Sequence, residues 1–154
     1  MADEPISLRR ARRDDVAAIV AMLADDHLGR GRERLESPLP DFYYAAFDVV
    51  ERNPNLTLMV AENGEGRVVG CLQLAVLPGL SSQGASRGLL EDVRVASDCR
   101  GRGIGEQLQW AIAEAKARGC NLVELLTHAS RVDAQRFYKR LGFVPSHVGM
   151  TVRF

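Results

Sequence analysis

A glycine-rich segment between a predicted strand and a predicted helix constrains this chain more than any other feature. Glycines let backbone N–H groups turn toward a ligand, and the start of a helix adds unpaired N–H donors and a positive dipole end. Such a turn predicts a site for phosphate groups, with arginines adding charge-assisted hydrogen bonds. The segment consists of Arg100, Gly101, Arg102, Gly103, Ile104 and Gly105.

The spacing of these glycines excludes two familiar phosphate loops. A dinucleotide fingerprint needs a glycine or alanine at its sixth position, which is Glu106 when counted from Gly101 and Leu108 when counted from Gly103. A Walker loop needs a Gly-Lys pair followed by Ser or Thr, and the chain has no Gly-Lys pair. The alternative to a ligand site is a tight glycine turn that carries two solvated arginines.

Hydrophobic periodicity along the rest of the chain predicts a mixed α/β (α+β) fold. We expect helices over 14–23, 41–50, 104–118 and 134–141, and strands over 6–10, 56–61, 68–76, 86–95, 122–127 and 144–154. Hairpins in the first half and a β-α-β unit in the second imply a central mixed sheet of about six or seven strands, with about four helices on both faces. The length of 154 residues fits one domain, 1–154.

Charge and composition exclude several classes of function. Lys plus Arg and Asp plus Glu both number 20, whereas a domain that wraps nucleic acid is normally strongly basic. No stretch approaches the roughly 18 apolar residues of a membrane span, and the acidic start lacks the apolar region of a signal peptide. No pair among the three cysteines and three histidines has metal-ligand spacing. We expect a cytoplasmic protein without metal, nucleic-acid or membrane partners.

Two linked motifs resemble the GNAT superfamily of acyl-CoA N-acyltransferases. Residues 100–105 match its Arg/Gln-x-x-Gly-x-Gly/Ala signature, and the preceding run 90–95 looks like its fourth strand. Residues 134–143, which include Tyr138, resemble the second motif of the family at the expected distance. The resemblance covers residues 6–154 in element order and is tightest over 89–143. It implies a single-domain, GNAT-like fold.

The resemblance also implies a co-substrate and its contacts. Acetyl-CoA would place its pyrophosphate on residues 100–105 and on the helix start at Glu106, and its pantetheine arm along the backbone of Val93 and Val95. Arg131 stands where many members carry an asparagine that bonds the pantetheine arm. That role is not transferred to Arg131, and a contact from its side chain to a cofactor phosphate or carbonyl stays open.

The implied reaction transfers an acetyl group directly to a primary amine. About one lysine-like amine in 10³ is neutral at pH 7, a penalty of roughly 4 kcal/mol that a base or a desolvating environment must offset. Glu91 is the candidate base, directly or through water. Asp92 is the alternative, because side chains alternate between the two faces of a strand and a bulge would change which of them shares a face with the ligand. Both could equally be a solvated acidic pair near a strand edge.

The resemblance places Tyr138 opposite the sulfur of the leaving group. Full proton transfer from a tyrosine to a thiolate is uphill by about 2 kcal/mol, so we expect a hydrogen-bond donor rather than a full acid. A backbone N–H near Val93 would bind the oxygen that gains charge. Without the resemblance, Tyr138 would be read as a core aromatic beside Phe137 and Leu141.

The sequence does not identify the amine, and both a small molecule and a protein stay open as the acceptor. The resemblance places its site in residues 25–44 and the C-terminal segment. An anionic group would suit the arginines there, and a cationic amine would suit Asp25, Asp26, Asp41, Tyr43 and Tyr44. A non-catalytic CoA-binding or regulatory module is the alternative function and predicts CoA binding without turnover. A homodimer is expected only because dimers are common in the family.

Overall fold

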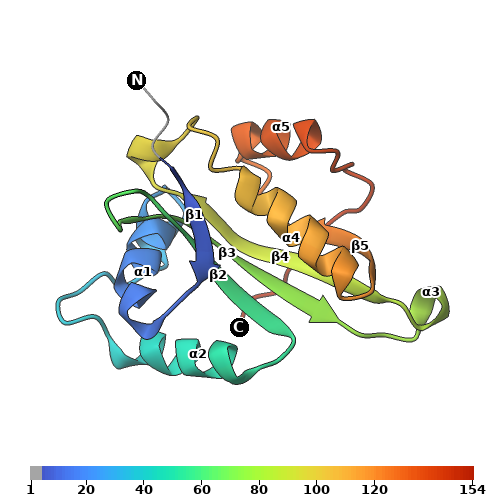
Figure 1. Ribbon diagram of the computed structural model, residues 1–154, viewed down its shortest axis with the longest axis horizontal. Coiled ribbons are helices and arrows are strands. Elements are labelled where there is room, and N and C mark those ends of the chain that lie inside the picture. Colours follow the sequence, from blue (N-terminus) through green and yellow to red (C-terminus); the bar gives the residue numbers. More distant parts are fainter. Residues whose placement is uncertain (1–4) are drawn as a thin grey trace.

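A single mixed sheet organises the molecule (Figure 1). The structure, a computed structural model, describes residues 5–154, apart from the side chain of Glu106. Within that part the strand order is β1-β2-β3-β4-β5, antiparallel from β1 to β4 and parallel between β4 and β5. The strands are β1 (Ser7–Arg10), β2 (Leu56–Glu62), β3 (Val68–Leu77), β4 (Ser86–Val95) and β5 (Cys120–Leu125).

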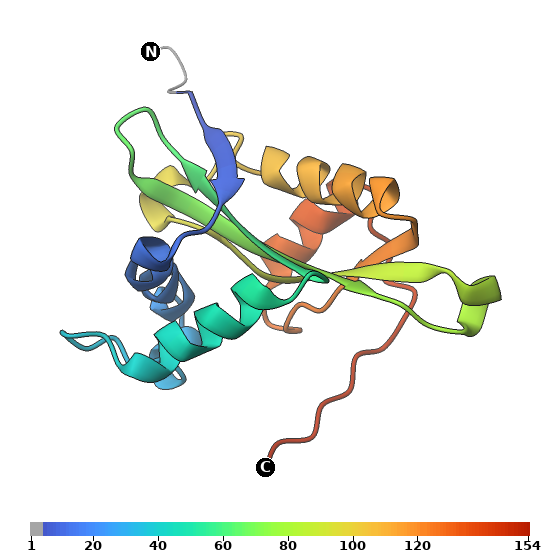
Figure 2. The same ribbon diagram turned by 60° about the horizontal axis from the view of Figure 1, so that its bottom comes forward.

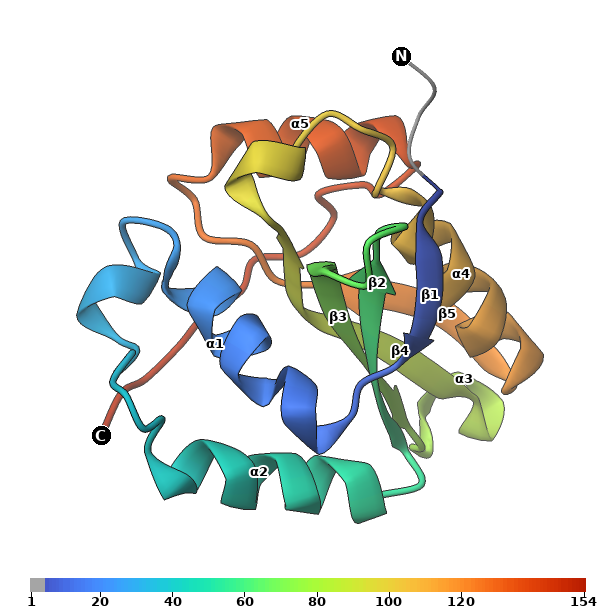
Figure 3. The ribbon, with the colours of Figure 1, turned by 60° about the vertical axis from the view of Figure 1, so that its left-hand side comes forward.

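Helices cover both faces of this sheet, so the expected mixed α/β architecture is confirmed (Figures 2 and 3). The first two helices pack on one face and the last two on the other, while a short helical turn joins β3 to β4. The helices are α1 (Val16–Ala24), α2 (Asp41–Arg52), α3 (Ser81–Gly84), α4 (Glu106–Ala117) and α5 (Val132–Arg140).

The burial of β3 follows from these two layers. Its sequence shows little alternation of apolar and polar residues because helices cover both of its faces. Leu72 and Leu74 are fully buried in the cluster that includes Leu108 of α4, whereas Cys71 is buried in the cluster that includes Ile19 of α1. This two-sided core fixes the register of β4, the next strand of the sheet.

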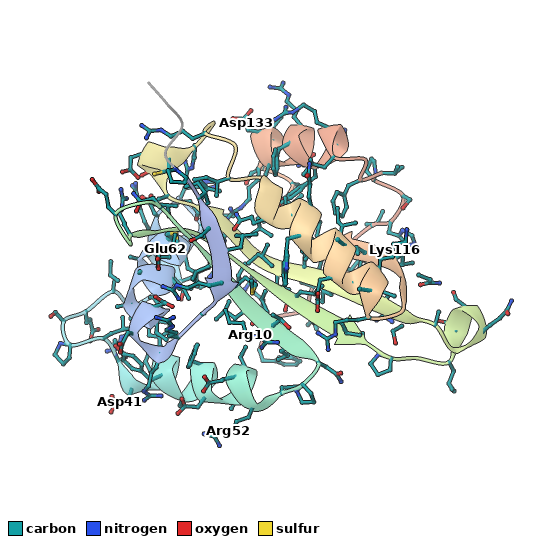
Figure 4. The ribbon with its side chains drawn as sticks, viewed as in Figure 1. Arg10, Asp41, Arg52, Glu62, Lys116 and Asp133 are labelled. Atoms are coloured by element: carbon teal, nitrogen blue, oxygen red, sulfur yellow. The ribbon has the colours of Figure 1, made fainter. Side chains whose placement is uncertain are left out.

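Charged side chains at the helix ends complement the helix dipoles. Asp41 and Asp133 lie in the first turns of α2 and α5, and Arg52 and Lys116 lie in the last turns of α2 and α4 (Figure 4). Negative charge at a helix start and positive charge at its end are both stabilising. None of the helices described over residues 5–154 is long and apolar enough to cross a membrane.

The predicted strand over 144–154 is wrong. These residues form no strand in the described structure, so the sheet has five strands instead of the six or seven expected. The segment does alternate apolar and polar residues, but a strand also needs a neighbour that pairs with its backbone groups. None pairs with it within residues 5–154.

An ion-pair network joins the start of the chain to the sheet. Arg9 donates to the carboxylate of Asp15 at 2.7 and 3.0 Å and to Glu62 at 2.6 and 2.8 Å. Asp15 is buried, and it also accepts the backbone N–H of Arg12 at 2.7 Å, so it closes the short 3-10 turn (Arg13–Asp15) that leads into α1. The hydrogen bond from Arg9 lowers the pKa of Asp15, although burial opposes that shift.

We expect Asp15→Asn to lower the free energy of unfolding at pH 7 by about 2 kcal/mol, because it removes a buried hydrogen-bonded charge. A carboxylate with a lowered pKa stabilises the fold at neutral pH, and this contribution is lost as the pH falls below about 4. Urea unfolding should therefore show a smaller difference between variant and wild type at pH 3 than at pH 7. The exposed neighbour provides the control, Asp14→Asn, and an equal effect of both variants would contradict the assignment.

Candidate active site

The sheet offers unpaired backbone groups where β4 and β5 stop pairing. Their parallel pairing ends at Leu90 opposite Leu125, whereas β4 continues to Val95. The N–H of Ala96 donates to β3 at 2.9 Å, so the alternation of a strand turns the backbone N–H and C=O of Val95 away from β3. The carbonyl of Val93 faces the same way. An extended ligand could pair with β4 on this side.

A bulge interrupts β4 just before these groups. Gln73 of β3 pairs with Glu91 and Cys71 pairs with Arg94, so two residues of β4 lie opposite one residue of β3. Asp92 lies in the bulge with a φ of 51°, in the left-handed region. Glu91 and Asp92 are both exposed although they are adjacent in the strand. The alternation of side chains along a strand therefore does not show which of the two carboxylates is the catalytic base.

The glycine segment forms the turn into α4. Gly101 and Gly103 have φ values of 79° and 76°, which favour glycine, and the side chain of Ile104 is buried in the core. The side chains of Arg100 and Arg102 are exposed. The buried side chain of Ile104 thus anchors the predicted phosphate turn to the core, whereas its two arginines extend into solvent. Glu106 begins α4, but its side chain lies outside the described residues.

Close packing joins this turn to α5. A Cβ atom on Gly105 would lie 2.7 Å from Cζ of Phe137, so only glycine leaves room for that ring. Tyr138 follows in α5, and its ring lies 5.6 Å from that of Phe137 and 5.9 Å from that of Phe143. The predicted cofactor turn and the predicted catalytic tyrosine therefore belong to one packed unit.

Tyr138 lies in a partly desolvated, electropositive setting. Burial raises the pKa of its hydroxyl, and the positive charges of Arg94 and Arg131 offset part of that shift. The hydroxyl remains protonated at neutral pH and can act as a hydrogen-bond donor. The two guanidinium groups would stabilise negative charge that develops near it.

An acidic residue connects these arginines. The Asp26 carboxylate lies 2.5 Å from Nη2 of Arg131 and 4.0 Å from Nε of Arg94. It also accepts the backbone N–H groups of Leu28 and Gly29 at 3.0 and 2.6 Å. The segment after α1 is thereby tied to β4 and to the loop before α5. Burial alone would raise the pKa of Asp26. The backbone hydrogen bonds and the positive charges of Arg131 and Arg94 outweigh that effect and lower it.

Arg32 extends this group of charges toward the bulge. Its hydrogen bond to Glu33 is the main reason for a raised pKa, and the negative charges of Asp92 and Asp26 add to the shift. We call Asp26, Arg32, Asp92, Arg94 and Arg131 the charged cluster. It brings together parts of the chain before α2, in β4 and before α5, and with Glu33, the partner of Arg32, its three positive charges face three negative ones.

The structure gives one predicted residue an unexpected partner and adds two residues that the sequence analysis did not single out. Arg131 pairs with Asp26, whereas the sequence raised only a cofactor contact for it. Sequence reasoning missed Arg94, whose side chain is only 17% exposed and donates to the carbonyl of Val93 at 2.9 Å. A charged residue between two core valines in a strand was the signal that pointed to it. Gln107, also missed, is buried and donates to the carbonyl of Arg94 at 3.4 Å.

Comparison with known proteins identifies the family. The model of the acetyltransferase (GNAT) family matches residues 17–143. This chain belongs to that family. It is 34% identical over 149 residues to the aminoalkylphosphonate N-acetyltransferase of Salmonella typhimurium strain LT2, covering 94% of this chain and 88% of that one. It is 32% identical over 97 residues to the glucosamine 6-phosphate N-acetyltransferase of Trypanosoma brucei brucei, covering 62% of this chain and 64% of the relative.

A crystal structure agrees with this fold throughout. A protein from Bacillus halodurans C-125, described as a transcriptional regulator, is 48% identical and superposes with a TM-score of 0.93, covering 97% of this chain and all of the other. Together with the family match and the named relatives, the fold identifies this GNAT protein as an acetyl-CoA-dependent N-acetyltransferase. Within residues 5–154, no group of three or more His, Cys, Asp or Glu side chains is arranged to hold a metal ion.

We expect Asp26→Asn to loosen both segments that Asp26 connects. An asparagine oxygen can still accept the N–H groups of Leu28 and Gly29, but it carries no charge for Arg131 and Arg94. Amides over 25–33 and 128–131 should exchange hydrogen about tenfold faster, as the loss of about 1.4 kcal/mol of local stability would produce. The exposed neighbour supplies the control, Asp25→Asn. Unchanged exchange in 128–131 would show that the ion pair does not hold that loop.

Proposed function

We propose that this GNAT enzyme acetylates the primary amine of a small molecule that also carries a phosphate or phosphonate group. The charged cluster beside Tyr138 is the observation that carries this proposal. Its arginines suit a phosphorus oxyanion, which guanidinium groups bind through paired hydrogen bonds, and its carboxylates suit an ammonium group. The names of both curated relatives combine these two features, an aminoalkylphosphonate in one and glucosamine 6-phosphate in the other.

Arg94 supports the oxyanion part of this proposal. Its Nε atom is buried and has no hydrogen-bond partner among the described residues, and its charge is balanced only in part by Asp26 at 4.0 Å. A buried donor gains most when a ligand oxygen reaches it. Arg32 has a half-exposed side chain and can meet a soluble acceptor. An oxyanion here would compete with Asp26 for the same guanidinium groups.

The residues of the GNAT signature fit acetyl-CoA as the co-substrate. The turn over 100–105 would hold its diphosphate through backbone N–H groups and through Arg100 and Arg102. The backbone of Val95 would pair with the pantetheine arm, and the carbonyl of Val93 could do so once Arg94 releases it. The packing of Phe137 on Gly105 supports a fixed distance between this turn and Tyr138. Acetyl-CoA supplies the acetyl thioester.

The proposed chemistry then divides among a few residues. Glu91 or Asp92, directly or through water, removes a proton from the ammonium group, so that the neutral nitrogen can form a bond to the carbonyl carbon. A backbone N–H near Val93 donates to the carbonyl oxygen as it gains charge. Tyr138 donates to the sulfur as the carbon–sulfur bond breaks. The nitrogen loses its second proton as the tetrahedral intermediate collapses, and that proton goes to sulfur, so CoA leaves as the thiol. The first proton passes from the carboxylate to solvent.

We expect Tyr138→Phe to lower kcat by about 10²-fold, because it removes a donor to developing charge and keeps the ring. The affinity for CoA, measured by calorimetry, should stay the same, since the ring packing is retained. Release of free thiol from acetyl-CoA reports kcat, and thermal unfolding checks that the variant is folded. A rate within twofold of wild type across the whole pH range would rule out this role for Tyr138.

The acceptor class can be tested with paired amines. An aminoalkylphosphonate and glucosamine 6-phosphate should be acetylated with higher kcat/KM than ethanolamine and glucosamine, which lack the oxyanion. Arg32→Gln should raise KM for the first pair about tenfold, equivalent to 1.4 kcal/mol, and leave the second pair unchanged. Arg30→Gln is the control at an exposed neighbouring arginine. Equal turnover of both pairs would overturn the acceptor class and leave the acetyltransferase activity standing.

A further inference from the structure

A glutamine occupies a core position in the first turn of α4. The side chain of Gln107 is only 1% exposed, and that of its neighbour Leu108 is fully buried. The amide Nε2 donates one long hydrogen bond, at 3.4 Å to the carbonyl of Arg94, and the amide oxygen Oε1 has no hydrogen-bond partner among the described residues. A buried amide that is only partly paired lowers stability relative to an apolar side chain of similar shape. The needs of the fold alone therefore do not explain a glutamine at this position.

Three parts of the chain meet closely around this amide. A Cβ atom on Gly70 of β3 would lie 3.2 Å from Oε1 of Gln107 and 3.2 Å from the carbonyl oxygen of Arg94. It would also lie 3.1 Å from Cγ2 of Ile104, in the turn before α4. Gly70 pairs with Val95 across β3 and β4. The absence of a side chain at position 70 thus lets the start of α4 approach the end of β4.

The carbonyl that Gln107 holds belongs to the peptide group that links Arg94 to Val95. A trans peptide group is planar, so its C=O and its N–H point in opposite directions. Because the carbonyl of Arg94 accepts from Gln107, the N–H of Val95 points to the other side of β4, which the parallel pairing with β5 leaves free beyond Leu90. A side chain that fixes this carbonyl therefore also fixes the direction of the N–H.

We propose that Gln107 is a positioning residue for acetyl-CoA, which holds the peptide group between Arg94 and Val95 so that the N–H of Val95 meets the pantetheine arm. The inference rests on the acetyl-CoA contacts proposed above. Gln107 follows the turn that would hold the diphosphate, so one short stretch of chain serves both parts of the co-substrate. This role explains why a partly paired amide is kept in the core at a cost in stability.

Gln107→Met tests this role, because methionine keeps the length of the side chain and removes the donor. The dissociation constant of CoA, measured by calorimetry, should rise about tenfold. That of ADP, which carries the diphosphate without pantetheine and is measured by competition with CoA, should stay unchanged. KM for acetyl-CoA should rise while kcat stays within about twofold, since the N–H of Val95 binds substrate and transition state alike. Gln109→Met, at an exposed position of the same helix, is the control.

The melting temperature separates positioning from folding. It should not fall in Gln107→Met or in Gln107→Leu, because both remove a buried amide that is incompletely paired. A lower melting temperature in both variants, or an equal loss of affinity for ADP and CoA, would mean that Gln107 stabilises the turn itself. Unchanged affinity for CoA would mean that Val95 needs no such support. Each of these three results would overturn the inference alone, whereas a wild-type protein that binds no CoA would overturn the proposed co-substrate contacts as well.

Discussion

The separation of β4 from β5 is the constraint on which the rest of the structure depends. Two parallel strands that paired along their whole length would use all the backbone groups between them. Here the pairing ends at Leu90, and the bulge at Asp92 turns the remainder of β4 while β3 still holds its other side. The backbone groups of Val95 are left without a strand partner, so water or a ligand must pair with them. The surrounding core makes this arrangement possible, because it holds β3 on both faces.

Charge placement around that point follows from the topology. Arg94 lies in β4, Arg131 precedes α5, and Asp26 follows α1, so three segments that are distant in sequence share one set of ion pairs. Their partial burial strengthens these interactions relative to exposed pairs. Tyr138 lies within the same field, with its pKa raised by burial and moderated by the two arginines. Positive charge thus acts on Tyr138 locally, although the formal net charge of the chain is zero.

Local features of the fold could be read from the sequence, and long-range ones could not. The glycine turn at 100–105 and the helical spacing around Tyr138 are local patterns, and the structure has the predicted elements there. The ion pair of Asp26 with Arg131 joins residues 105 positions apart, and no local pattern encodes it. The strand expected over 144–154 failed for a related reason. Alternation describes what a segment can do, whereas a strand also requires a neighbour.

The packing of Phe137 on Gly105 constrains the sequence in one part of the chain more than in another. Gly105 of the turn and Phe137 of α5 are in close contact, so a side chain at position 105 would have to displace the ring next to Tyr138. Residues 25–33 are joined to β4 and to the loop before α5 by Asp26, and His27 adds a contact of 3.3 Å from its Nε2 to Oγ of Ser130. This segment can therefore diverge in sequence as long as Asp26 and Gly29 are kept, because a Cβ atom on Gly29 would collide with the carbonyl oxygen of Leu23. A new acceptor specificity can evolve there without rebuilding the catalytic scaffold.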